Sequence, residues 1–158
     1  MILDTPFPPD LRVENECATL NAAGFEVHIF ALSYEKSYKK SEVIDGIHIH
    51  RYYCSPTCYK LSALAYSVPF YHARMRRLIR KFIVKNELKK IHIHDIQVAR
   101  SVFQLKKKLD LTITLDLHEN RPEIMRHYKH VKSLLGRLTI FPEIWRKYEE
   151  KYAQEAEK

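Results

Sequence analysis

The stretch IHIHDIQVARSVFQLKKKLDLTITLDL, residues 91–117, decides the fold class. Residues 91–95 and 111–117 are short apolar runs typical of strands, and a helix is expected between them at 97–108. Two strands that are joined through a helix pair in parallel, whereas an antiparallel pair needs only a tight turn. The stretch therefore predicts an α/β unit within a parallel sheet.

The same alternation continues toward the N-terminus. A helix is expected from Leu11 to about Ala23, with Asp10 as its N-cap and Gly24 closing it. The other expected elements are a strand at 25–32, a polar loop at 33–41, a β segment at 42–53 with a turn at Asp45-Gly46, and a helix from 67–69 to about 85. Strands alternating with helices predict a doubly wound, mostly parallel sheet.

The pattern of expected elements indicates truncation at both ends of the chain. The first apolar run, Met1–Leu3, is short for a strand, and the final helical stretch from Trp145 to Lys158 is followed by no strand. We therefore expect residues 1–158 to be one truncated domain of a longer protein.

The composition is that of a globular protein with a basic lean: 158 residues, 46% hydrophobic, 29% charged, with a net charge of +8. Three Cys are too few for a disulfide framework, and three Gly argue against a glycine-rich phosphate loop. No apolar run approaches the ~18 residues of a transmembrane helix. The start has neither the basic nor the apolar region of a signal peptide, so a cytoplasmic protein is expected.

The positive charge is concentrated between Ala65 and Lys90, where eight basic residues accompany a single acid, Glu87. The helix there presents bases beside an uncharged, aromatic segment at 61–73, which suits an anionic membrane surface. The alternative is a helix that packs an apolar stripe on the sheet and leaves its bases in solvent. This explains the helical spacing of its apolar residues but not a surface of eight bases with one acid. Nucleic acid is not expected, because the aromatic residues do not alternate with the exposed bases. The residues assigned to this membrane surface are Arg74, Arg76, Arg77, Arg80 and Lys81.

Ligands of open α/β sheets bind beyond the carboxyl ends of the strands. Three segments are expected there: 4–12, His94-Asp95, and 118–121. His118 is the sharpest candidate, since a histidine at a strand end can donate a hydrogen bond or transfer a proton. The alternative is a ring that only caps the strand. Asp116 and Glu119 need not face each other, so they are not taken as a glycosidase pair.

Two histidine pairs, His48/His50 and His92/His94, have a spacing that could ligate zinc. No third ligand is close in sequence to either pair, so no metal is expected. Cys54 and Cys58 are expected in a loop, without a second pair that would complete a zinc site. The chain contains no Walker A, Gly-x-Gly-x-x-Gly or Gly-x-Ser-x-Gly motif.

Five motifs in register resemble family 4 glycosyltransferases of the GT-B fold. TPFPPDLRVENE and AAGFEV match the family's proline-rich loop and the end of its first helix, and three strand motifs follow in the expected order. The matched segments are residues 5–16, 22–27, 45–49 (DGIHI), 91–95 (IHIHD) and 115–119 (LDLHE).

The resemblance implies a Rossmann-like, acceptor-side N-terminal domain with strand order beginning 3-2-1-4-5. It implies retaining transfer of a sugar from a nucleotide-sugar donor to a glycan or lipid-linked acceptor in polysaccharide or glycolipid synthesis, with neither cofactor nor metal. His118 matches the family's essential histidine beside the donor sugar. The implied substrate-binding residues are Asp10, Arg12, His94, Asp95 and Glu119.

Two departures from the family are present. Pro8-Pro9 stands where many members have a glycine pair, and nothing corresponds to the donor-binding C-terminal domain with its Glu-x7-Glu motif. The resemblance thus implies a fragment that is inactive alone. The alternative reading is a non-catalytic membrane- or partner-binding module on a Rossmann-like scaffold.

Overall fold

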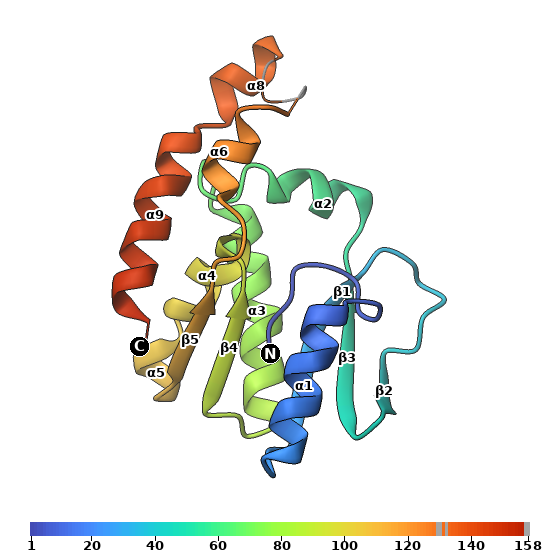
Figure 1. Ribbon diagram of the computed structural model, residues 1–158. Helices are drawn as coiled ribbons and strands as arrows, with labels where there is room; N and C mark the ends of the chain where they lie inside the picture. Colours follow the sequence, from blue (N-terminus) through green and yellow to red (C-terminus); the bar gives the residue numbers. More distant parts are fainter. Residues whose placement is uncertain (129–130, 132, 157–158) are drawn as a thin grey trace.

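The computed structural model describes residues 1–128, 131 and 133–156, with the side chains at 135 and 137 outside the description. It is an α/β structure in which helices pack on both faces of β-structure (Figure 1). The helices are α1 (Leu11–Ala22), α2 (Pro56–Ser62), α3 (Phe70–Lys85), α4 (Ile96–Phe103), α5 (Lys106–Leu109), α6 (Arg121–Met125), α8 (Leu134–Thr139) and α9 (Pro142–Glu155).

The strands form two groups. In the first, β1 (Val27–Ser33) pairs in parallel with β3 (Ile47–Tyr53), and β2 (Ser41–Ile44) pairs antiparallel with β3. In the second, β4 (Lys90–His94) pairs in parallel with β5 (Thr112–Asp116), as residues 91–117 predict.

The residue Ile2 connects the two groups. It forms parallel bridges to Phe30 of β1 and to Ile93 of β4. Its backbone N–H donates to the carbonyl of His92 at 2.8 Å, and its carbonyl accepts from His94 at 3.0 Å. The N-terminal residues thus run between β1 and β4.

Each face of the strands is covered by its own apolar layer. Val13 and Cys17 of α1 pack with Ile29 and Ile49 on one face. On the other face α3 buries Met75, Ile79 and Phe82, and α4 packs beside it. The C-terminal helix α9 closes this second layer against α4 and α6.

Local sequence signals account for two element boundaries. The carboxylate of Asp10 accepts from the backbone N–H groups of Arg12 and Val13, so it caps α1 as predicted. Asp45 and Gly46 both take positive φ, the conformation that a two-residue hairpin turn needs between β2 and β3.

Two expectations are wrong in detail. The helix expected at 97–108 is interrupted between α4 and α5. The N–H of Leu105 bonds to the carbonyl of Val102, three residues back, and the side chain of Leu105 is buried in the core. Cys58 does not lie in a loop but in α2, which Ser55 caps and Pro56 begins. No helix in the described part of the chain is long and apolar enough to cross a membrane.

Candidate functional site

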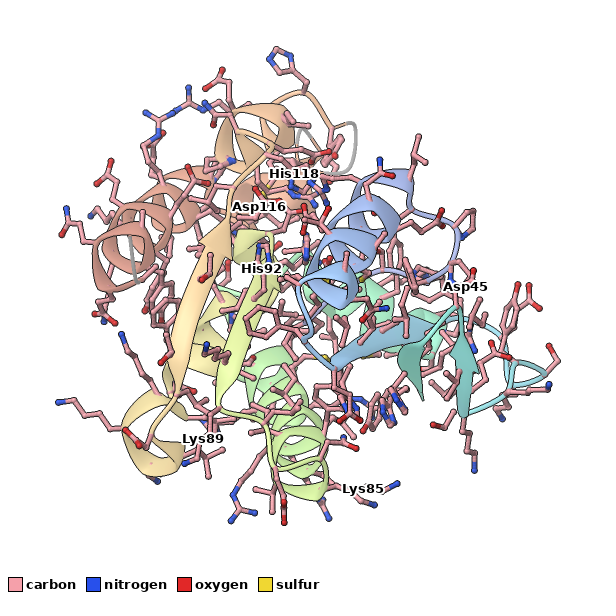
Figure 2. The ribbon with its side chains drawn as sticks, turned by 60° about the horizontal axis from the view of Figure 1, so that its bottom comes forward. Asp45, Lys85, Lys89, His92, Asp116 and His118 are labelled. Atoms are coloured by element: carbon pink, nitrogen blue, oxygen red, sulfur yellow. The ribbon has the colours of Figure 1, made fainter. Side chains whose placement is uncertain are left out.

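The carboxyl ends of β4 and β5 and the first turns of α1 bring charged side chains together. Figure 2 shows Asp116 and His118 close to each other, with His92 near them. Lys85 and Lys89 lie away from them, at the bottom of this view. The convergence of segments that are far apart in sequence is what the strand-end argument predicts.

His118 lies between two carboxylates. Its Nε2 is 3.5 Å from Oδ2 of Asp95, and its Nδ1 is 3.4 Å from Oδ2 of Asp116. The side chain is 32% exposed. A ring that is held from both sides yet open to solvent is oriented and still able to reach a ligand.

Arg121 lies between Asp95, the partner of this histidine, and a second acid, Glu119. Its guanidinium lies 3.5 Å from Asp95 and 3.7 Å from Glu119. Burial raises the pKa of Asp95, although Arg121 opposes the shift. Asp95 also has a positive φ of 71°, which is uncommon for a residue with a side chain, and its N–H bonds to the carbonyl of Asp116.

Asp4 is, with Asp95, one of the two buried acids of the site. Burial raises its pKa to about 6, and the nearby guanidinium of Arg121 only partly offsets this shift. Both side chains line a cavity of about 930 Å³, whose remaining wall is mainly aromatic and aliphatic and includes Tyr34, Tyr71 and Trp145. The charged cluster therefore borders a space that is large enough for a small-molecule ligand.

Asp116 is the centre of the second half of the site. Its Oδ2 lies 3.2 Å from Nη1 of Arg12 and 3.6 Å from Nδ1 of His94. The other nitrogen of His94 is 3.5 Å from Oε2 of Glu16. Burial, and then His92, lower the pKa of His94 to about 3, so the ring is neutral at pH 7.

The structure sorts the residues that the sequence singles out. His118, Asp95, His94 and Arg12 meet in one cluster, and Glu119 lies at its edge through Arg121. Asp10 caps α1 and makes no described ion pair. Sequence reasoning missed Glu16, although its i,i+4 spacing from Arg12 puts both on one helix face.

The basic surface lies on α3, apart from the cluster. Its five residues are exposed except for Arg76, which is half-buried. Arg76 donates to the side chain of Gln104, and Arg74 donates to the backbone carbonyl of Tyr53. Phe70, at the start of the helix, is 69% exposed, so an apolar ring accompanies the bases.

Two groups of described residues have the arrangement of metal ligands: Glu16, His92 and His94 within the cluster, and Glu26, His28 and His48 outside it. Comparisons of the chain with protein-family models, with curated proteins and with solved structures find no match.

Proposed function

We propose that this chain is the N-terminal, acceptor-side domain of a retaining glycosyltransferase of the family 4 type. The observation that carries the proposal is the meeting of His118, Asp95, Arg12 and Arg121 at the carboxyl ends of the strands, beside a large cavity. The five sequence motifs supply the reaction class, and this geometry supplies a site in which it can occur.

The proposal includes a doubly wound, Rossmann-like sheet with strand order 3-2-1-4-5. In this numbering residues 1–3 are strand 1, in the central place, β1 and β3 are strands 2 and 3, and β4 and β5 are strands 4 and 5. The parallel bridges of Ile2 to both strand groups support this arrangement. The domain that binds most of the nucleotide sugar lies beyond Lys158 in this proposal, and the fragment alone does not transfer sugar.

In the proposed reaction, the bond between the anomeric carbon and the leaving phosphate oxygen breaks, and a bond to the acceptor oxygen forms on the same face. The acceptor hydroxyl proton leaves with the nucleoside diphosphate. His118 hydrogen-bonds the donor sugar, and Asp95 and Asp116 fix the orientation of its ring. Arg12 is placed at the acceptor side by α1, which Asp10 caps.

The acceptor is a glycan or a lipid-linked glycan, and the cavity beside Asp4 is its binding space. Aromatic and aliphatic walls with a few polar groups are typical of such binding sites. The basic face of α3, with exposed Phe70, holds the enzyme on the anionic inner surface of the cell membrane.

The test is a donor screen with the natural full-length protein. Nucleoside diphosphate release is measured with uridine-, guanosine- and adenosine-diphosphate sugars, with and without lipid-linked acceptor. The proposal predicts release that depends on both one donor and the acceptor. Anionic vesicle binding without release from any donor would instead favour the non-catalytic module.

A further inference from the structure

A second cluster of side chains lies on β1 and β3, on the face that α3 covers. His28 and His48 are direct partners across the parallel pair, and their rings stack at 4.6 Å between centroids. Glu26 precedes His28 by two residues and reaches the same face. The rings of His50 and Phe82 are in contact there, which places the cluster beside α3.

Two of the three separations between the ligand atoms are close to those around a tetrahedral metal. Oε1 of Glu26 lies 3.0 Å from Nε2 of His28 and 3.4 Å from Nε2 of His48, and the ligand atoms of all three residues lie within 4.8 Å of one another. Ligand atoms bound to zinc at about 2.0–2.1 Å in a tetrahedron are about 3.3 Å apart. Only small side-chain movements are needed to close the site.

Nε2 of His28 donates to Oε1 of Glu26 at 3.0 Å in the metal-free cluster, and the contacts behind it allow the ring proton to move to Nδ1 when a metal replaces it. A metal on Nε2 of His28 needs the ring proton on Nδ1, and an acceptor for that proton, Nε2 of His50, lies 3.3 Å away. His50 then carries its own proton on Nδ1, which lies 3.4 Å from the hydroxyl of Ser41. Metal-binding histidines usually have such an outer partner.

We propose that Glu26, His28 and His48 bind a zinc ion, with His50 positioning the ring of His28. Two imidazoles and one carboxylate are a donor set that zinc prefers, with water completing the coordination. The half-exposed His48 and exposed Glu26 leave an entry path, while the 12%-exposed ring of His28 anchors the site.

The other arrangement of this kind, Glu16 with His92 and His94, is already occupied by the charges of the proposed transfer site: Asp116 lies 3.6 Å from His94 and 3.2 Å from Arg12. The zinc site on β1 and β3 shares no residue with the proposed transfer site, so a result that contradicts one proposal leaves the other untouched.

The test is calorimetric titration of the metal-stripped 158-residue chain with Zn²⁺. We expect saturation at one ion, loss of this binding in Glu26→Gln and His48→Gln, and about 10- to 100-fold weaker binding in His50→Leu. The control is His127→Gln, which changes an exposed histidine elsewhere and should bind as the wild type.

Melting temperatures of the metal-free variants show whether the fold is kept. Glu26 and His48 are exposed or half-exposed, so their substitutions should leave it intact. Failure of the wild type to saturate would overturn the proposal. So would unchanged affinity in Glu26→Gln and His48→Gln, since the ion would then be bound elsewhere, as at Glu16, His92 and His94.

Discussion

The substitution Asp4→Asn should make the protein more stable at neutral pH. Asp4 is a buried carboxyl whose pKa rises from 3.8 to about 6, mainly because burial disfavours its charge. At pH 7 the group is nevertheless ionised, so the folded state carries a buried charge that the unfolded chain exposes to water. An amide of the same shape removes that charge.

The magnitude follows from the shift. About two pKa units, at about 1.4 kcal/mol each, give about 3 kcal/mol of destabilisation at pH 7. Between pH 4 and pH 6 the folded state holds the proton that the unfolded state has released, so the contribution of Asp4 to the free energy of unfolding falls as pH rises. The advantage of Asp4→Asn should therefore shrink toward pH 4.

Urea unfolding of wild type and Asp4→Asn at several pH values measures this difference directly. The matched control is Asp45→Asn, because Asp45 is exposed and its positive φ also suits asparagine. A variant that is less stable than wild type at pH 7, or an advantage that grows on acidification, would refute the reasoning.

Three further predictions concern other parts of the molecule. Burial lowers the pKa of His72 to about 3, so the unfolded chain binds a proton below pH 6.5 that the folded state does not. As the pH falls below 6.5, the free energy of unfolding of the wild type should decrease by up to about 1.4 kcal/mol per pH unit through this group, and that of His72→Gln, measured with urea, should decrease less. Asp10→Ala should destabilise the fold by about 1 kcal/mol through loss of the α1 cap, without slowing sugar transfer by the full-length protein; a large loss of turnover at unchanged stability would contradict this. Reversing the exposed bases of α3 to Glu should abolish sedimentation with anionic vesicles, each base contributing about 1 kcal/mol, whereas the double change Lys107→Glu and Lys108→Glu on α5 should have less effect. The bases of α3 to be changed are Arg74, Arg77, Arg80 and Lys81.

Much of the fold can be predicted from local patterns. The run at 91–117 predicts β4, α4 and β5, because strand, helix and strand each span enough residues to show their character. Local patterns do not predict α2, although Ser55 and Pro56 carry the signals of a helix start. With seven residues, that helix is too short for a clear apolar period.

The candidate site is predictable only where strand ends define it. His94 ends β4 and Asp95 and His118 follow strands, and the carboxyl ends of parallel strands meet at one edge. The central role of Asp116 cannot be read from sequence, because it depends on the tertiary contact that brings Arg12, in the first turn of α1, to the end of β5. The same holds for His28, whose neighbours on β3 are set by strand register.

The most direct test of the transfer site is the turnover of His118→Ala in the natural full-length protein. Loss of a positioned histidine should lower kcat by about 10²- to 10⁴-fold. The melting temperature should stay nearly unchanged, because the side chain is partly exposed. The control His127→Ala should retain full activity. Near-wild-type turnover in His118→Ala, with the fold intact, would contradict the account.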